Sequence, residues 1–330
     1  ILSYLKLRAG WSKVGQVNLG GTYGAYQLVP TISPAGGYGF PYGSLPGYTV
    51  DNTLVSPNLE PEITKGWEAG FDLNLIKDRV ESTFTWFKTK TDNQTVTTSV
   101  SSATGFTGLR TNTGQTQSSG IETAIHGTLV KNKSWSVIVG GNYAYLDNKV
   151  NYISTSLPRI PLATYGSTAG SYAVASQVFP VIMGYDYLRD PQGHVIVDAS
   201  SGLPTKSDTI SILGNATPKH KLGVDAAVRF KNCAFSSVFE YRGGYQIYNA
   251  MGPELDWSGT GYRTAIYNRQ RFVFPNSVYW DGAKYVPNTN IEIKNGNGNN
   301  GFWTDGINRD VSSNYVTSAD FWKLREFSIA

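Results

Sequence analysis

One stretch of alternating side chains constrains the fold of this 330-residue chain more than any other feature. It reads Ile63-Thr-Lys-Gly-Trp-Glu-Ala-Gly-Phe-Asp-Leu-Asn-Leu75. Apolar residues occupy one face, interrupted only by Lys65, and polar or small residues occupy the other. Such alternation predicts a β-strand with one apolar and one polar face. The run exceeds the roughly 5–6 residues of an average strand and is long enough for a tilted membrane strand of about 9–11.

The same alternation recurs in seven further runs. The cleanest begin near Leu5, Trp135 and Leu222. Less regular runs cover about 80–91, 119–130, 234–242 and 319–329. In the last of these, Trp322 and Leu324 fall on the opposite face from Phe327 and Ile329. This change of face predicts a β-bulge and leaves the register near the C-terminal end open.

The links between the runs alternate in length. Three are short and charged, namely Lys77-Asp78-Arg79, Lys131 to Ser134 and Lys231 to Cys233. The other four run roughly over 15–62, 92–118, 147–218 and 243–318. Short turns at one end and long loops at the other are typical of a transmembrane antiparallel β-barrel with its long loops outside the cell. The alternative is a secreted β-sandwich such as an adhesin, whose outer faces should be polar and whose loops should be short.

Composition also favours a membrane barrel over a soluble enzyme. Charged residues make up 16% of the chain, against roughly 25% in soluble domains. The 21 Tyr, 14 Phe and 8 Trp are many for so few charges, but a barrel excludes charge from its lipid-facing band and collects aromatic rings at its rims. No stretch approaches the roughly 18 apolar residues of a membrane helix.

Other classes of protein receive little support from the residues. The net charge of +4 is not gathered into a basic patch, so we expect no binding to nucleic acid. The single Cys233 excludes an internal disulfide and a cysteine-based zinc site. His126, His194 and His220 fall in different predicted elements, so we expect no metal site, cofactor or catalytic set. We expect His126 to face the lumen, His194 to lie in a loop and His220 to lie at the rim of the barrel.

Two loop segments resemble ligand-binding motifs without matching them. The segment Asp190 to Asp198 lacks the spacing of a calcium loop, so we expect a reverse turn at Pro191-Gln192-Gly193. The Gly-rich stretch 295–301 has no following GK[ST] and no helical pattern. We expect it to be a flexible loop tip.

Aromatic residues in the long loops are the candidate contact residues. Rigid rings with a polar edge suit the faces of sugars and the side chains of peptides. The alternatives for any single ring are loop–loop packing or contact with a partner lid. The candidates for substrate or lid contact are Tyr38, Tyr42, Trp257, Tyr262, Tyr279, Trp280 and Trp303.

Five segments stand out in order along the chain, namely Leu5 to Gly15, Asn58 to Phe71, Asn112 to Glu122, Gly214 to Lys219 and Phe321 to Arg325. Together they resemble the SusC/RagA family of TonB-dependent transporters of Gram-negative Bacteroidota. They resemble the family patterns LKLRASWGxTGN, NPxLKPExTxxxExGxD, NxGxxxNxGxE, GNxxPK and FLRLRN. Ser118 and Glu326 stand where the family usually has Asn.

The resemblance implies more than the residues alone. It implies that residues 1–330 are part of one outer-membrane β-barrel domain, about eight strands of an expected 22-stranded barrel. The N-terminal plug and the last strands would then lie outside this sequence. It also implies TonB-dependent import of an oligosaccharide or peptide across the outer membrane, with a SusD-like surface lipoprotein as lid and with outer-membrane lipid around the barrel. The alternatives are a passive porin, which would lack a plug, and an outer-membrane hydrolase, for which no nucleophile–base–orienter set is visible.

Overall fold

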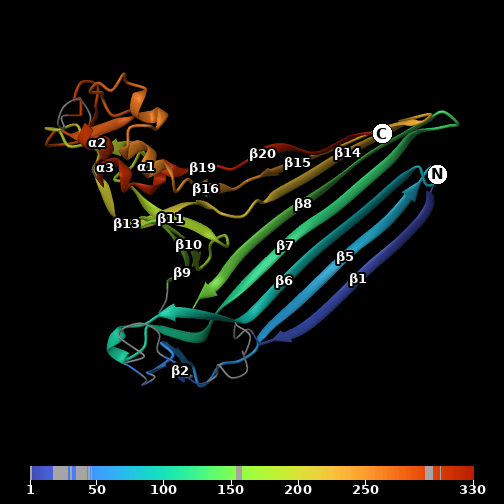
Figure 1. The fold of residues 1–330 in the computed structure, drawn as a ribbon, viewed down its shortest axis with the longest axis horizontal. Helices are drawn as coiled ribbons and strands as arrows, with labels where there is room; N and C mark the ends of the chain where they lie inside the picture. Colours follow the sequence, from blue (N-terminus) through green and yellow to red (C-terminus); the bar gives the residue numbers. More distant parts are fainter. Residues whose placement is uncertain are drawn as a thin grey trace.

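The computed structural model describes residues 2–17, 29, 32–34, 43, 45, 47–153, 158–293, 300–304 and 306–330. Its main feature is one long antiparallel sheet, which we call the wall (Figure 1). All eight predicted runs are strands of the wall, and the three predicted short turns join them. In sheet order the strands are β1 (Leu2–Gln16), β5 (Glu62–Leu75), β6 (Val80–Ser99), β7 (Gly108–Lys131), β8 (Trp135–Ile153), β14 (His220–Phe230), β15 (Cys233–Gly243) and β20 (Phe321–Ile329).

The strand register gives the wall two chemically different faces. Phe71 lies between Leu7 and Phe84, and Val224 lies between Gly141 and Phe239. The side chains predicted to face lipid therefore share one apolar face. They are Trp67, Phe71, Leu73, Val137, Val224 and Val228.

The opposite face carries the charged residues predicted to face the lumen. Arg8 Nη2 lies 3.1 Å from Asp72 Oδ1, and His126 Nε2 lies 3.3 Å from Asp225 Oδ1. The second contact crosses the intervening strand β8 at Gly140, where a Cβ atom would overlap the His126 ring. The ion pairs show that the polar side chains of neighbouring strands meet on one face, as the alternation predicts.

The apolar face of the wall is largely exposed. Leu7 is 76% exposed and Trp322 is 61% exposed, and apolar side chains of every wall strand extend this surface between them. Soluble proteins rarely expose an apolar band of this extent, because covering it is worth roughly 25 cal/mol per Å². We therefore expect this face to contact lipid.

The predicted bulge near the C-terminal end is confirmed. The pairing of β15 with β20 skips Arg325, so that Val238 faces Glu326 while Phe239 faces Leu324. The extra residue turns the last four apolar side chains onto the same face as Phe239. These side chains are Trp322, Leu324, Phe327 and Ile329.

The predicted loop at 92–118 is wrong in its extent. Strands β6 and β7 continue as a paired hairpin to Ser99 and Gly108, with two register shifts between Thr91 and Thr95. Their continuation is rich in threonine and contains Val96, and β-branched residues fit extended strands. A short 3-10 helix, η2 (Ser102–Thr104), closes the hairpin.

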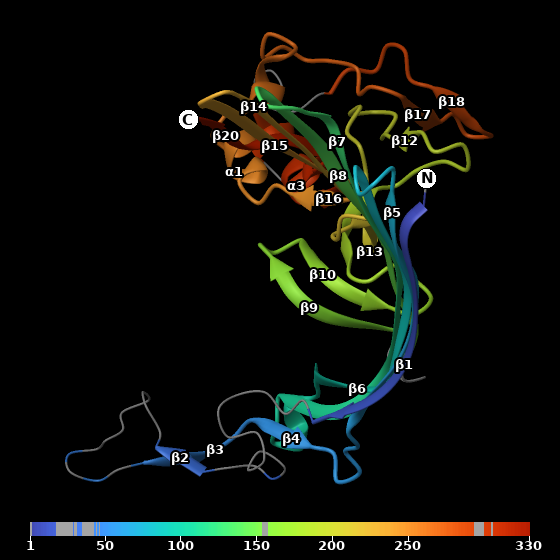
Figure 2. The same cartoon turned by 90° about the vertical axis from the view of Figure 1, so that its right-hand side faces the viewer.

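The region 147–218 is a folded excursion rather than an irregular loop. It forms an antiparallel sheet ordered β13-β11-β10-β9, with β9 (Arg159–Tyr165), β10 (Ala169–Val174), β11 (Val181–Tyr187) and β13 (Lys206–Asn215). Val150 and Ile153 of β8 pack against Ile160 and Ala173 of this sheet. Both wall residues belong to the polar face, and Figure 2 shows β9 and β10 on the concave side of the wall. The excursion therefore covers the lumen side.

The region 243–318 also folds, mostly into short elements. Strand β12 (Val195–Ile196) joins β17 (Ser277–Trp280) and β18 (Tyr285–Pro287) in a small sheet, while β16 (Gln246–Tyr248) pairs with β19 (Val316–Ser318). Its helices are α1 (Gly252–Trp257), η3 (Tyr262–Ala265), α2 (Asn300–Thr304), α3 (Gly306–Arg309) and η4 (Ser312–Tyr315).

The first long loop, 15–62, contains the short strands β2 (Ile32–Pro34), β3 (Tyr48–Val50) and β4 (Thr53–Val55). Strand β4 adds to the wall in parallel beside β7. Among the described helices, none has the length and apolar character needed to cross a membrane.

Candidate functional site

The two folded excursions are joined by polar contacts, and we call the joined structure the loop platform. Ser312 Oγ donates a 2.7 Å hydrogen bond to the Thr168 carbonyl, and Ser313 Oγ donates one of 2.6 Å to Asp186 Oδ1. Asn314 Nδ2 donates a 2.8 Å bond to the Tyr187 hydroxyl. Three consecutive residues of η4 therefore fix one excursion against the other.

These contacts change the acidity of the groups they join. Burial alone would raise the pKa of Asp186, but hydrogen bonds from Arg189 and Ser313 outweigh it and hold the pKa below its usual value. Burial raises the pKa of Tyr187 to about 12, although the hydrogen bond from Asn314 opposes the change. At neutral pH the junction therefore contains a carboxylate and a protonated phenol, which suit the observed hydrogen bonds.

A second polar cluster lies inside the region 243–318. The Asp256 carboxylate is buried and accepts a 2.9 Å hydrogen bond from the Tyr315 hydroxyl and one of 3.2 Å from Asn308 Nδ2. Arg263 Nη1 lies 3.4 Å from the same oxygen. Buried charges are stable in proteins when they are paired and hydrogen-bonded in this way. The cluster links α1, η3, α3 and η4 at one point.

An aromatic cluster forms the apolar core of the same region. Phe272, Ile293, Phe302 and Trp303 are buried together, and the rings of Phe302 and Trp303 meet edge to face with centroids 4.9 Å apart. Trp303 is 6% exposed. Its buried position favours packing between loops over contact with a substrate or a lid protein.

The remaining predicted contact residues differ in exposure. Tyr262 is 84% exposed, while Trp257 and Trp280 each expose about half of their surface, at 52% and 51%. Tyr279 is partly buried beside Val278 in β17. Tyr38 and Tyr42 lie outside the described residues. Thus three of the proposed rings, on α1, η3 and β17, are exposed at the surface, although Arg309 lies over the Trp257 ring and Tyr285 beside that of Trp280.

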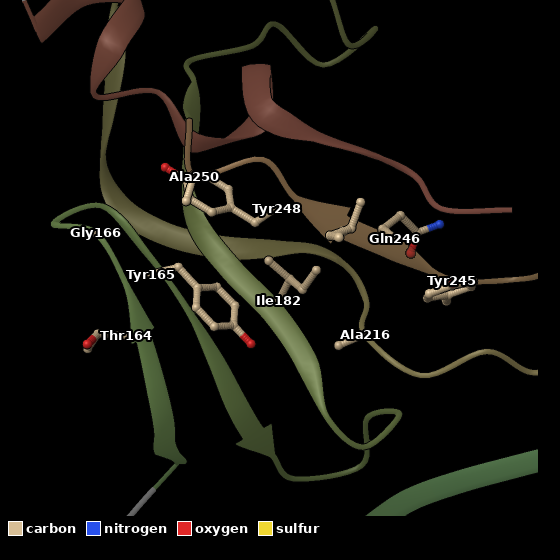
Figure 3. A pocket seen from close by; sticks show the side chains of 10 residues that line it. Thr164, Tyr165, Gly166, Ile182, Ala216, Tyr245, Gln246, Tyr248 and Ala250 are labelled. Atoms are coloured by element: carbon tan, nitrogen blue, oxygen red, sulfur yellow. The ribbon is translucent and has the colours of Figure 1, made fainter. Parts of the chain in front are cut away.

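A pocket of about 560 Å³ lies where the two excursions meet the rim of the wall. Its size is within the usual range of ligand sites, about 300–1,000 Å³. Figure 3 shows its lining side chains, with Tyr165 coming from β9 and Tyr248 from β16. Their rings stack with centroids 6.1 Å apart. The lining contains no acidic or basic residue, and its members are Thr164, Tyr165, Gly166, Ile182, Ala216, Tyr245, Gln246, Ile247, Tyr248 and Ala250.

The pocket tyrosines were not among the predicted contact residues. Tyr165 belongs to one excursion, while Tyr245 and Tyr248 belong to the other. No spacing in the sequence shows that these segments meet. A weaker signal was present, because Tyr245 and Tyr248 directly follow the end of an alternating run, where a barrel collects aromatic rings.

Two of the segments with family resemblance meet at the rim through Asn112. Its side-chain amide donates to the carbonyls of Glu60 and Asn93 at 2.8 and 2.6 Å, while its Oδ1 accepts from the Glu60 backbone amide at 2.6 Å. Glu62 Oε1 in turn accepts from the backbone amide of Thr95. These residues therefore tie the start of β5 to the extended hairpin, which is a structural role.

Gly120 in the same segment permits a close approach of strands. A Cβ atom on this residue would overlap the Tyr145 carbonyl oxygen and lie 2.9 Å from the ring of Phe87. An overlap with backbone can be relieved only if the strand moves. The glycine is therefore required by the packing of β7 against β8.

Asn215, in the segment with family resemblance that precedes β14, also has a structural role. Its side chain donates to the carbonyls of Thr217 and Gly244 at 2.6 and 3.1 Å and accepts from the Thr217 amide. Its backbone amide donates to Gln246 Oε1 at 2.7 Å. This asparagine ties the end of β13 to the residues that precede β14 and to those that follow β15, and it contacts the pocket-lining residue Gln246.

The structure gives the three histidines separate environments. His126 faces Asp225 on the polar face, His194 bonds Asp190 in a loop, and His220 stacks near Tyr143 at the rim. These are the predicted locations. The described residues contain no group of three or more His, Cys, Asp or Glu that could hold a metal ion.

The turn predicted at Pro191-Gln192-Gly193 is confirmed. The Gly193 amide donates a 3.0 Å hydrogen bond to the Asp190 carbonyl, and Gly193 has a φ of +90°. The Asp190 carboxylate accepts from the backbone amides of Gln192 and His194. Asp190 is therefore used within its own turn.

An antiparallel wall with tight turns at one end and long excursions at the other is typical of a section of a β-barrel with large loops. Residues 2–206 match the family described as TonB dependent receptor-like, beta-barrel. The chain belongs to this family, which is one of transporters and not of enzymes.

Two named relatives place the chain within the family. The chain is similar to the TonB-dependent receptor SusC of Bacteroides thetaiotaomicron, with 23% identity over 280 residues, which cover 79% of this chain and 27% of SusC. It is 21% identical to the TonB-dependent receptor P39 of Formosa agariphila, with coverage of 99% and 34%. The chain thus spans about a third or less of the length of these relatives.

Solved structures show the same fold. The RagAB peptide transporter matches with a TM-score of 0.67 and 14% identity, covering 99% of this chain and 34% of that chain. The RagAB peptide importer in its closed-closed state matches with a TM-score of 0.68 and 16% identity, with the same coverage.

Proposed function

We propose that this chain is a continuous section of a single barrel domain in a SusC-like importer of the outer membrane. The importer would take up an oligomeric nutrient, a glycan or a peptide, with energy supplied through TonB and with a SusD-like surface lipoprotein as the lid over the loops. The observation that carries the proposal is the loop platform, an ordered structure on the lumen side that joins two long excursions.

An ordered platform suits recognition because less conformational entropy is lost on binding. The uncharged, tyrosine-lined pocket at its base and the exposed rings of Trp257, Tyr262 and Trp280 offer flat apolar surfaces with polar edges. Such surfaces fit sugar faces and peptide side chains. The similarity to the RagAB peptide transporter supports the peptide class.

A passive porin is the rival function, and the energy requirement separates the two. Uptake by the complete transporter should stop when TonB is deleted or when the proton gradient is collapsed, because import would depend on that energy. A porin would continue to equilibrate solutes across the outer membrane. Uptake that survives both treatments would support the porin and contradict active import.

The exposed rings can be tested without damaging the platform. The segment between Trp280 and Trp303 is unsuitable for deletion because it contains part of the buried aromatic cluster. Instead, Trp257→Ala/Tyr262→Ala/Trp280→Ala should reduce nutrient uptake or capture of the lid protein by about a hundredfold, since each of the three interface rings contributes about 1 kcal/mol.

The matched control is Ile266→Ala, which removes an exposed apolar side chain from the same region but no aromatic ring. It should leave uptake and lid capture unchanged. Both assays should be compared at equal surface abundance of the transporter. Normal uptake and normal lid capture by the triple variant would show that these rings take no part in recognition.

A further inference from the structure

Four lysines lie together on the apolar face of the wall, level with the end of β1 and the start of β5, which lead to the first long loop. Lys13 is directly opposite Lys65, and Lys65 is directly opposite Lys90. Residues that lie directly opposite one another on neighbouring strands form a row across the wall. Lys88 is opposite Trp67, in the next row of the same face, further from the long loops. Neighbouring strands are about 4.8 Å apart, so the first three Cα atoms span only about 10 Å. We call these four residues the lysine cluster.

The aromatic residues beside the cluster indicate its depth. Trp11 and Trp67 share the face of the cluster, lie one row further into the wall than Lys13 and Lys65, and have ring centroids 6.3 Å apart. Trp86 lies one row further in again, opposite Ala69. Tryptophans of a membrane protein gather at the level of the lipid headgroups. The lysine ammonium groups can therefore reach the headgroup layer from the aromatic band, with their aliphatic stems on apolar surface.

The charge of the cluster is only partly neutralised by the protein. Lys65 Nζ lies 3.0 Å from Asp92 Oδ2, and this carboxylate also accepts a hydrogen bond from Gln115. In the part of the chain that the structure describes, the ion pairs include no carboxylate partner for Lys13, Lys88 or Lys90. Four ammonium groups and Asp92, which also attracts Lys90, leave a local charge of +3. Two strands further along the same face, Lys149 and Asp147 carry opposite charges and leave this sum unchanged.

We propose that the lysine cluster binds the phosphate-bearing headgroup of a lipid in the outer leaflet. The long loops lie on the extracellular side of an outer-membrane barrel, so a lysine on the apolar face at that end meets the outer leaflet. Apolar side chains below the cluster, including Leu7, Phe71 and Phe84, continue as a surface for acyl chains. Adjacent cation and hydrocarbon surfaces fit a lipid better than a soluble anion.

Basic residues near an anionic membrane surface strengthen binding by about fivefold each. The three unpaired lysines therefore predict a large and measurable preference for a phosphorylated lipid. The proposal does not depend on which nutrient the transporter imports, because the cluster lies on the face opposite the lumen.

The test uses the complete transporter, purified and reconstituted into phosphatidylcholine vesicles. Four preparations are compared: vesicles alone, vesicles with lipid A, vesicles with phosphate-free lipid A, and vesicles with inorganic phosphate in the buffer. Lipid A should raise the melting temperature and remain bound in native mass spectrometry. Phosphate-free lipid A and inorganic phosphate should do neither.

The variant Lys13→Gln/Lys88→Gln/Lys90→Gln should weaken lipid A binding by about a hundredfold. A matched control, Lys6→Gln/Lys221→Gln/Lys323→Gln, removes three lysines from the polar face and should bind lipid A normally. Replacement of the cluster by arginine should preserve binding. If the triple variant does not assemble, Lys88→Gln alone should still show a loss of about fivefold.

Three results would overturn the proposal. The first is equal retention of phosphorylated and phosphate-free lipid A by the wild-type transporter. The second is a stabilisation by inorganic phosphate as large as that by lipid A, which would make the cluster a site for a free anion. The third is unchanged lipid A binding by Lys13→Gln/Lys88→Gln/Lys90→Gln.

Discussion

Neighbouring strands of the wall meet along most of their length, whereas the loop platform depends on contacts between distant segments. Strands β6 and β7 pair from Val80 and Gly127 to Ser99 and Gly108, with two register shifts on the way. In the platform, Ser313 bonds Asp186 across 127 positions of sequence. The wall is thus built from repeated neighbouring pairs, and the platform from a few specific side chains. The two regions should therefore respond differently to substitution.

The largest effect is expected on the apolar face of the wall. An arginine that faces lipid near the middle of the membrane costs about 2–4 kcal/mol, so Phe71→Arg should strongly reduce barrel assembly. Glu68→Arg on the polar face of the same strand should assemble almost normally, because its side chain faces water. Heat-modifiable mobility and surface abundance of the complete transporter measure assembly. Equal assembly of both variants would contradict the assignment of the faces.

The alternation that supports this prediction explains why the wall could be predicted from the sequence. In each wall strand, apolar and polar residues alternate, so the sequence shows which side chains share a face. The bulge in β20 is also visible in the sequence, because the apolar residues change face between Leu324 and Phe327. The strands between 92 and 118 were missed because their threonines and glycines give no contrast between the faces. Their pairing is visible only in the structure.

The platform could not be predicted in the same way. Trp303 and Tyr262 are both aromatic residues of one long excursion, yet one is buried with Phe272 and the other is exposed. The difference arises from contacts between segments that no local pattern connects. For the same reason the pocket tyrosines Tyr165 and Tyr248 were not predicted to meet.

A medium effect is expected from Tyr315→Phe in the platform. The substitution removes a hydroxyl that donates to the buried Asp256 carboxylate and accepts from Asn308, at a cost of about 1.5–3 kcal/mol because the acceptor is charged. Limited proteolysis and hydrogen exchange should show a looser region 243–318, while barrel assembly remains normal. A loss of assembly would show that the platform and the wall fold as one unit.

The matched control for this substitution is Tyr262→Phe. Tyr262 is largely exposed, so loss of its hydroxyl should leave proteolysis and exchange unchanged. Equal loosening by the two variants would show that the polar cluster around Asp256 does not stabilise the region 243–318 in particular.

The smallest effect is expected from pH at the turn that follows β12. Hydrogen bonds from the side chains of Ser200 and Ser201 lower the pKa of Asp198 to about 2, below the value of about 3.9 in an unfolded chain. Because the folded-state pKa is the lower one, this carboxylate stabilises the turn above pH 3.9, and its contribution is lost as the pH falls through about 2. Hydrogen exchange around residues 198–203, corrected for the intrinsic effect of pH, should therefore show weaker protection at pH 2.5 than at pH 5. Asp198→Asn keeps an acceptor oxygen but cannot titrate, so its protection should not change over this interval. The wall strands should also keep their protection, since their pairing is independent of this turn. A wild-type turn with equal protection at both pH values would show that the serine hydrogen bonds contribute little to the order of the platform.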